Sequence, residues 1–326
     1  MLSLVAESIY WMNRYLERAE NFARFIHVNL HLVLDQATAT GEQWAPLVLV
    51  SGDHEDFAKR YGAATRERVI DFLTFDQENP NAILSCLSHA RENARSVREI
   101  ISSEMWEQIN RFYLLVKGAV RERALETPHD FFTEIKMASH LYGGIAEATM
   151  SRGEGWHFGR LGGLLERADK TSRILDVKYF VLLPDPADVG TPADNVQWAA
   201  LLRSASAFEM YRKRFGLIAP ERIADFLILD REFPRAILHC LIEGEDSLRT
   251  LTGSAAATFH NEAEQELGRL RAELSYAQVE EVIAGGLHEF LDDLQVRLNR
   301  IDVAVFSTFF APRPVGRAKV LSREQT

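Results

Sequence analysis

The sequence predicts an all-α protein, a helical bundle built from two tandem copies of one unit. Three observations support this fold class: helical periodicity, helix-start residues at regular places, and a long internal repeat. Apolar or small residues follow a heptad-like spacing from Leu16, and again from Leu165. No segment shows the sustained alternation of apolar and polar residues that is typical of a strand.

The internal repeat is the strongest signal in the chain. Residues 43–87 align without gaps onto residues 197–241, and 21 of these 45 aligned positions are identical. Upstream, residues 16–20 (LERAE) align onto residues 165–169 (LERAD) with a shift of 149 instead of 154 residues. The difference of five residues falls in a proline-rich loop at 184–192, where a duplicated fold tolerates a change of length.

The repeat sets the expected domain organisation. We expect repeats at residues 1–150 and 151–310, each with five or six helices, packed together as one domain. A near-twofold rotation should superpose residues 8–100 on residues 157–254. Residues 311–326 contain two prolines, a glycine and several charges, so we expect a flexible tail.

Several helix starts can be placed from single residues. Thr65 is a residue type preferred at an N-cap, and the second copy has Pro220 at the first helical position. Pro80 and Pro234 should begin the next helix of each copy in the same way. The glycine-rich stretch 153–163 lacks the Lys-Ser/Thr ending of a phosphate loop and follows a helix, so we interpret it as the joint between repeats.

Composition excludes several classes of protein. The 326 residues are 47% hydrophobic, which is ample for a core, and carry a formal net charge of −10. That charge argues against a protein that binds nucleic-acid backbones. The N-terminus has no basic region and no apolar run reaches eighteen residues, so we expect neither a signal peptide nor a membrane span. Cys86 and Cys240 lie in apolar helical contexts, which indicates buried thiols in a reducing, cytoplasmic compartment.

Each copy opens with a helix that carries an adjacent Glu and Arg, at Glu17-Arg18 and at Glu166-Arg167. Adjacent residues on a helix diverge by roughly 100°, so such a pair cannot close on itself. The face of Arg18 is rich in aromatic residues, and a guanidinium buried there must be paired. We therefore predict that both arginines are mostly buried and bonded to carboxylates on other helices, with Glu17 and Glu166 as reciprocal partners.

Two interpretations of these helices stay open. One is a structural ion-pair network that fixes the register of the helices. The other is a shared cleft in which arginines bind a carboxylate or phosphate group of a substrate, while the glutamates orient them or act as acid and base. In the second interpretation Glu17 and Glu166 are catalytic. The substrate-binding residues are then Arg18, Arg24, Arg95, Arg167, Arg173 and Arg249.

A second basic feature is the stripe Arg91–Arg95–Arg98, with spacings of four and three residues along one predicted helix. Its glutamate neighbours make a solvated face the more typical interpretation. The second copy retains only Arg249, which aligns with Arg95, so these two arginines are the better functional candidates.

A metal site is not signalled by the sequence. His27, His31 and Asp35 share one helical face and could bind a metal ion. Their counterparts in the second copy include Asp176 and Phe180, and no further ligand is indicated. We therefore expect no metal and no cofactor.

Three segments, in order, resemble the bacterial alpha-E family, a helical domain named for its Glu-Arg motif. They are residues 15–24 (YLERAENFAR), 90–110 (with ARENARSVR and EMWEQIN) and 165–173 (LERADKTSR). The resemblance covers roughly residues 1–310. The sequence departs from the family at Gly162-Gly163, where Gly-Arg would be expected, so the second site should be less basic.

The resemblance implies a function through genomic context. Proteins of this family are typically encoded beside, or fused to, a circularly permuted ATP-grasp protein, often near transglutaminase-like and proteasome-like peptidases. The leading hypothesis is an accessory or substrate-positioning partner of an ATP-grasp amidoligase, in a pathway of peptide or amide formation or of protein tagging. The alternatives are a stand-alone enzyme that uses the Glu-Arg pairs and a purely structural interaction module. We expect no nucleic acid or membrane partner.

Overall fold

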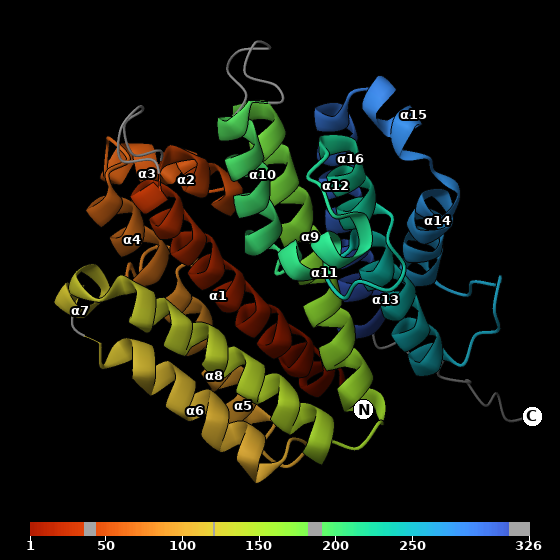
Figure 1. Ribbon diagram of the computed structural model, residues 1–326. Helices are drawn as coiled ribbons and strands as arrows, with labels where there is room; N and C mark the ends of the chain where they lie inside the picture. The colour runs from red at the N-terminus through yellow and green to blue at the C-terminus, as the bar shows by residue number, and fades with distance from the viewer. Residues whose placement is uncertain (36–43, 120, 182–190, 313–326) are drawn as a thin grey trace, which may run out of the picture.

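The computed structural model describes residues 1–35, 44–119, 121–181 and 191–312 (Figure 1). These ranges contain α-helices and one short π-helix but no β-strand, which confirms the all-α fold class. The first half comprises α1 (Ser3–Asp35), α2 (Ala45–Ser51), α3 (His54–Arg60), α4 (Arg66–Thr74), α5 (Ile83–Ser96), α6 (Ser103–Lys117), α7 (Arg121–Glu126) and α8 (Pro128–Thr149).

The second half has the same order of elements. It comprises α9 (Glu154–Val181), α10 (Pro192–Ser204), α11 (Phe208–Phe215), α12 (Pro220–Ile228), α13 (Ile237–Thr252), α14 (Glu262–Tyr276), α15 (Val279–Ala284), α16 (Leu287–Val305) and the π-helix η2 (Phe306–Phe310). Within the described residues, each half thus has eight α-helices where the sequence predicted five or six. The difference arises because turns divide the chain between the long helices into short ones, such as the seven-residue α2 and α3.

The packing also recurs between the halves. Helix α1 packs against α5 and α8, and α9 packs against α13 and α16, their counterparts. Each half also packs a short helix on the long helix of the other half: α2 packs on α9, and α10 packs on α1. This agreement concerns the order and the neighbours of the helices. The near-twofold superposition of residues 8–100 on 157–254 stays a prediction.

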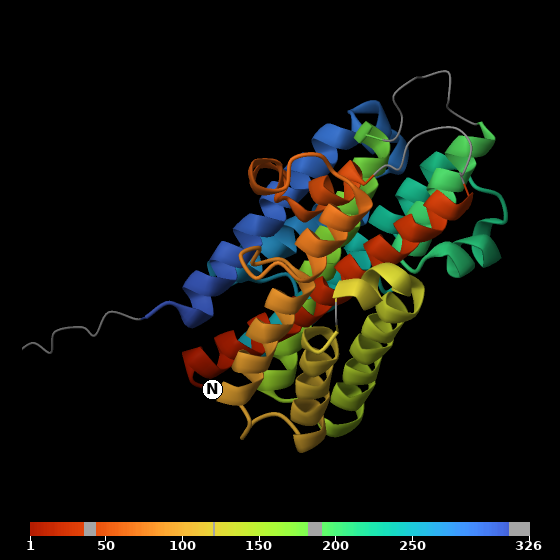
Figure 2. The same cartoon turned by 90° about the vertical axis from the view of Figure 1, so that its left-hand side faces the viewer.

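Helices α1 and α9 form the centre of the molecule, and their chains run in the same direction. They start side by side near the N-terminus and splay apart toward their C-terminal ends (Figures 1 and 2). At the starts of the two helices, the amino group of Met1 lies 2.6 Å from Oε2 of Glu154. Helices of the first half cover one side of this pair and helices of the second half cover the other (Figure 1).

The glycine-rich stretch is not a joint between repeats, as the sequence suggested, but the first turns of α9. Its glycines allow the backbones of α1 and α9 to approach closely. A Cβ atom on Gly162 would lie 2.4 Å from the carbonyl oxygen of Tyr10, and one on Gly159 would lie 2.5 Å from Nδ2 of Asn13. Gly163, by contrast, faces open space. The missing side chain at position 162 is therefore a requirement of the contact between helices.

Two of the four helix starts predicted from single residues are confirmed. Thr65 is the N-cap of α4, and Pro220 is the first residue of α12. The expectation for Pro80 and Pro234 was wrong, because α5 and α13 begin three residues after them. In the first copy the side chain of Asn79 accepts a hydrogen bond from the amide of Asn81 (2.9 Å). This local bond holds the proline in a turn before the helix begins.

Both cysteines are free and buried, as predicted. Burial raises the pKa of the Cys86 thiol and of the Cys240 thiol to about 12. None of the helices in the described ranges combines the length and the apolar character needed to cross a membrane. Residues 313–326, which make up most of the predicted tail, lie outside the described ranges.

The close approach of α1 and α9 can be tested at two neighbouring glycines. Gly162→Ala should lower the free energy of unfolding by about 1–3 kcal/mol, because the new methyl group must push α9 away from the carbonyl of Tyr10. Gly163→Ala is the matched control, since no atom lies within 4 Å of its added Cβ. It should be neutral or stabilise by up to about 1 kcal/mol, because alanine favours helix. Urea denaturation measures both, and equal effects would contradict the close contact.

Candidate functional site

The two Glu-Arg pairs meet where α1 and α9 lie side by side. Arg18 donates from Nε and Nη2 to the two carboxylate oxygens of Glu166, at 2.6 and 2.9 Å. Arg167 donates from the same two nitrogens to the carboxylate of Glu17, at 3.0 and 2.8 Å. Both contacts have the two-bond fork geometry that suits a guanidinium and a carboxylate. The predicted reciprocal pairing is confirmed.

Each glutamate also has further donors. The side chain of Glu166 is completely buried. It accepts a hydrogen bond from Nε of Arg14 (3.0 Å), and its carboxylate lies 3.3 Å from Nζ of Lys170. Glu17 accepts bonds from Nη1 of Arg235 (3.0 Å) and from Nδ2 of Asn21 (3.1 Å). These bonds satisfy carboxylates whose burial without partners would cost several kcal/mol each.

The additional arginines come from different places in the two copies. By the repeat offset Arg14 corresponds to Gly163, so the second copy has no equivalent donor on α9. Arg235, in the turn just before α13, supplies that donor instead, and its counterpart in the first copy is Asn81. Asn81 accepts a bond from Nη1 of Arg18 (2.6 Å). The reduced basicity expected from Gly163 is thus offset by an arginine from the turn before α13.

An outer set of charges surrounds these pairs. Glu20 contacts Arg24 and also accepts a bond from Nη2 of Arg235 (2.6 Å). Asp169 binds Lys170 and Arg173, each at 2.9 Å. On the other side, Arg14 reaches Asp302 of α16, which also accepts a hydrogen bond from the hydroxyl of Tyr10.

The described ion pairs form two clusters, and each has one more cation than carboxylate. The Glu166 cluster has four cations and three carboxylates: Arg14, Arg18, Lys170 and Arg173 with Glu166, Asp169 and Asp302. The Glu17 cluster has three cations and two carboxylates: Arg24, Arg167 and Arg235 with Glu17 and Glu20. Both clusters therefore keep a surplus positive charge.

The arginines hold both glutamates in the ionised form. Burial by itself raises the pKa of Glu17, but the charges of Arg167 and Arg235 outweigh it and lower the pKa to about 2. Burial likewise opposes ionisation of Glu166, and Arg18, Lys170 and Arg14 hold its pKa well below the usual range. A general acid or base works best with a pKa near the working pH. These carboxylates are therefore better suited to anchoring arginines than to transferring protons.

Four of the six predicted substrate-binding arginines lie in these clusters: Arg18, Arg24, Arg167 and Arg173. Arg24 is buried, its Nε has no hydrogen-bond partner, and burial together with Arg235 lowers its pKa to about 9. Arg167 and Arg173 are 27% and 23% exposed, so they can be reached from solvent.

The other two predicted arginines do not share an environment. The side chain of Arg95 is 65% exposed and bonds Glu92 at 2.8 Å. Arg249 donates two bonds to Glu245, at 3.1 and 2.7 Å, and also contacts the backbone carbonyl of Ala255. Neither belongs to the two clusters defined above.

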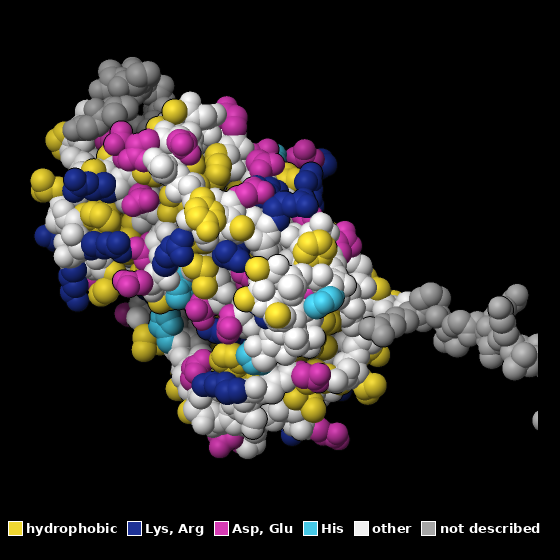
Figure 3. Space-filling view, turned by 90° about the vertical axis from the view of Figure 1, so that its right-hand side faces the viewer, with side chains coloured by type: hydrophobic (Ala, Val, Ile, Leu, Met, Phe, Trp, Pro, Cys, Tyr) yellow, Lys and Arg dark blue, Asp and Glu magenta, His cyan; other side chains and the backbone are white. Residues whose placement is uncertain are grey.

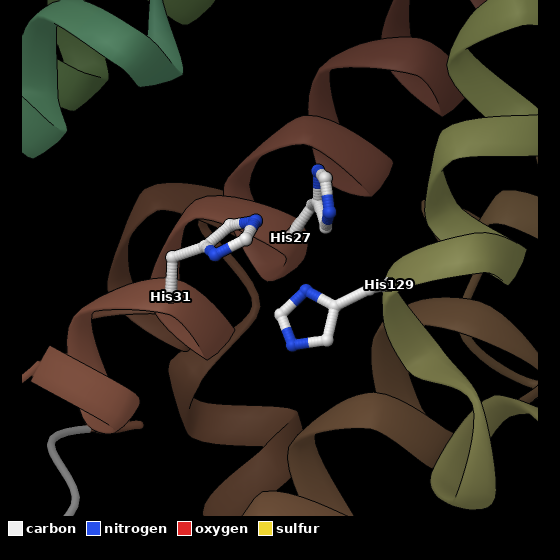
Figure 4. Close-up of side chains that lie close together, drawn as sticks. All are labelled: His27, His31 and His129. Atoms are coloured by element: carbon white, nitrogen blue, oxygen red, sulfur yellow. The ribbon is translucent and has the colours of Figure 1, made fainter.

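Three imidazoles form a separate group beside α1. The sequence groups His27 and His31 with Asp35, whose side chain lies outside the described residues. The structure adds His129 from α8, and one nitrogen of each ring lies within 4.8 Å of the others (Figure 4). Burial and the neighbouring Lys136 lower the pKa of His27 to about 3. No sequence motif links His129 to the other two histidines, because it lies on a distant helix.

Residues 1–310 match a family described as Alpha-E, a predicted alpha-helical domain with a conserved ER motif. The chain belongs to the Alpha-E family. In this Alpha-E protein, the two ER dipeptides are Glu17-Arg18 and Glu166-Arg167, and they bond each other across the contact between the halves.

Curated relatives of this Alpha-E chain are longer proteins. An uncharacterised protein of Mycobacterium bovis is 23% identical over 310 residues, which cover 89% of this chain and 34% of the relative. An uncharacterised protein of Mycobacterium tuberculosis is 22% identical with the same coverage. The chain thus spans about a third of the length of the curated relatives it matches. No solved structure matches it.

Removal of one cluster arginine tests whether the pairs stabilise the fold. Arg18→Ala should lower the free energy of unfolding by about 3 kcal/mol, because it leaves Glu166 buried without its fork-shaped partner. The value should fall at the lower end of the usual range, since Arg14 and Lys170 still contact Glu166. Arg95→Ala is the control and should change stability by no more than about 0.5 kcal/mol, because this arginine is exposed. A loss below about 1 kcal/mol in Arg18→Ala, by urea denaturation, would favour a substrate clamp over a structural role.

The lowered pKa of Glu17 gives a pH dependence with a definite sign. Because the pKa is about 2 in the folded state and near 4.5 in the unfolded state, this group stabilises the fold above pH 4.5. Its contribution should be lost progressively as the pH falls toward 2. The stability of Glu17→Gln should therefore lie below that of the wild type at pH 6, and the gap should narrow as the medium is acidified. Thermal unfolding at several pH values measures the gap, and a constant gap would contradict the assignment.

Proposed function

We propose that this Alpha-E protein is an accessory, substrate-positioning partner of an ATP-grasp amidoligase. The pathway would form amide bonds at the expense of ATP, in peptide synthesis or in protein tagging. Transglutaminase-like or proteasome-like peptidases would act in the same pathway. The observation that carries the positioning role is the saturation of both ER glutamates by arginines of the opposite half.

Because both ER glutamates are fully paired, a role in substrate binding is favoured over acid-base catalysis. Glu17 and Glu166 each hold several donors, so neither has the poised pKa expected of an acid or base at neutral pH. The surplus positive charge of the two clusters suits an anionic group, such as the carboxylate or phosphate of a substrate. Arg167 and Arg173, which are partly exposed, are the residues best placed to meet such a group.

Two further observations favour a partner that binds the nucleotide. The described ranges contain no strand and hence no strand-to-helix phosphate loop. Most of the sequence of the mycobacterial relatives lies outside the region that matches this chain. A helical unit joined to other sequence in its relatives is consistent with a component that works together with another domain, as the family context implies.

The stripe Arg91–Arg95–Arg98 is the surface that we assign to the partner. It is not confined to one helix, as the sequence predicted, because α5 ends at Ser96 and Arg98 lies in the turn that follows. Arg95 and Arg98 are exposed, and the guanidinium of Arg98 lies 4.8 Å from the ring centre of Trp106 on α6. Arginine and tryptophan are enriched at the centres of protein interfaces. Arg91 is less available, because it is half-buried and donates a bond to Asn110 (2.7 Å). The face over the second half shows basic and acidic side chains interspersed, with no field of one sign (Figure 3).

Co-purification with the ATP-grasp protein is the first test, followed by an assay of ATP-dependent amide formation with each protein alone and with both. We expect a complex and a higher rate with both proteins present. Arg95→Glu combined with Arg98→Glu should weaken the complex at least tenfold at low salt and less at high salt, since charge complementarity guides docking. Arg269→Glu is the matched control, an exposed arginine on α14 in the other half.

Two outcomes would overturn the proposal. If the isolated chain binds ATP with micromolar affinity, the stand-alone enzyme becomes the better interpretation. If the ATP-grasp protein neither binds the chain nor gains activity from it, a structural interaction module remains. Circular dichroism of the charge-reversed variant should match that of the wild type, which shows that any loss of binding is local.

A further inference from the structure

We propose that His27, His31 and His129 form a binding site for a divalent metal ion of the zinc type, at the contact between α1 and α8. The site is separate from the Glu-Arg clusters, and the proposal is independent of the partnership with an ATP-grasp enzyme.

The helices bring the three rings together from two directions. His27 and His31 are four residues apart on α1, so they lie one turn apart on the same face. His129 is the second residue of α8. The ring centroids are 4.7, 5.3 and 4.4 Å apart for the pairs 27–31, 27–129 and 31–129. Figure 4 shows the three rings grouped around a common point between the two helices.

This geometry is close to that of a metal site. One nitrogen from each ring lies within 4.8 Å of the other two. Tetrahedral zinc binds imidazole nitrogens at about 2.0–2.1 Å, which places two ligand nitrogens about 3.3 Å apart. Rotations of the side chains can supply the remaining contraction, and His31 is exposed to solvent. Two histidines four residues apart on one helix are also the spacing found in helical zinc motifs.

A second, independent observation concerns His129. Its Nδ1 is buried and has no hydrogen-bond partner. A buried polar nitrogen left without a partner costs free energy, and such atoms are rare in native proteins. A metal ion held between the rings would satisfy it.

In the second half of the chain, the polar side chains at the corresponding position pair with each other and need no metal. His288 is the second residue of α16, as His129 is of α8, and Asp176 corresponds to His27 by the repeat offset. There Nδ1 of His288 lies 2.5 Å from Oδ1 of Asp176, and that bond raises the pKa of the histidine. In the first half both matching positions are imidazoles, which cannot form such an ion pair with each other.

The donor set selects the class of metal. Imidazole nitrogens suit zinc, copper and nickel, whereas magnesium and calcium prefer oxygen ligands. Three histidines leave a fourth position for water or for a group of a substrate or partner, as in catalytic zinc sites. Lys136 opposes metal binding, because its Nζ lies 2.6 Å from Nδ1 of His27 and repels a cation. We therefore expect moderate affinity, with a dissociation constant of about 1 µM.

The test uses the full chain, purified without a polyhistidine tag, stripped with EDTA and dialysed. Calorimetric titration with zinc chloride should show one equivalent bound, and zinc should raise the thermal midpoint of unfolding. Cobalt(II) should give the absorption bands of a tetrahedral ion. Magnesium chloride should give neither heat nor stabilisation.

Variants locate the site. His31→Ala and His129→Ala should each weaken zinc binding at least tenfold, whereas the control His54→Ala, an exposed histidine on α3, should bind as the wild type does. Lys136→Met keeps all three rings and removes the repelling charge, so it should bind zinc as tightly as the wild type or more tightly. If a histidine variant fails to fold, the zinc affinities of Lys136→Met and of the wild type still test the proposal.

The proposal is overturned if the wild type binds no zinc at micromolar concentrations, or if magnesium binds equally well. It is overturned as well if His129→Ala folds and retains full affinity, or if Lys136→Met loses affinity. Each of these results can be told apart from failure of the amidoligase partnership, because none involves a second protein or ATP.

Discussion

The reciprocal ion pairs between α1 and α9 are the contact on which the rest of the structure depends. Each half provides a buried carboxylate and the guanidinium that the other half requires. Separated halves would leave Glu166 and Glu17 without their main partners, at a cost that exceeds the usual benefit of a surface ion pair. The helices must therefore lie close and parallel, and the glycine at position 162 makes that distance sterically feasible.

Much of the fold and part of the site could be predicted from residues alone. Repeat and periodicity predicted the all-α class, and the reciprocal pairing followed because adjacent residues on a helix cannot face each other. Other features could not be predicted, because they depend on which distant helices meet. Arg235 compensates for the missing counterpart of Arg14 from the turn before α13, and His129 on α8 joins two histidines of α1. Such contacts have no signature in spacing along one helix.

The structure changes how the ER motif is understood. Its glutamates are strongly hydrogen-bonded and ionised, so they serve as anchors that fix the arginines in place. Arginines held in this way lose less side-chain entropy when they bind an anion, because their conformations are already restricted. One network can therefore stabilise the fold and prepare a binding surface, which brings the two interpretations of the motif closer together.

A contact in which residue i of one copy meets residue j of the other, and j meets i, is the pattern of a symmetric homodimer. In a homodimer every substitution appears twice, on both sides of the axis. In a fused chain each copy can change alone, and the pairs Arg14/Gly163 and His27/Asp176 show that the copies have done so. Covalent linkage thus permits asymmetry: one corner of the molecule can carry three imidazoles while the corresponding corner carries an ion pair of Asp176 and His288.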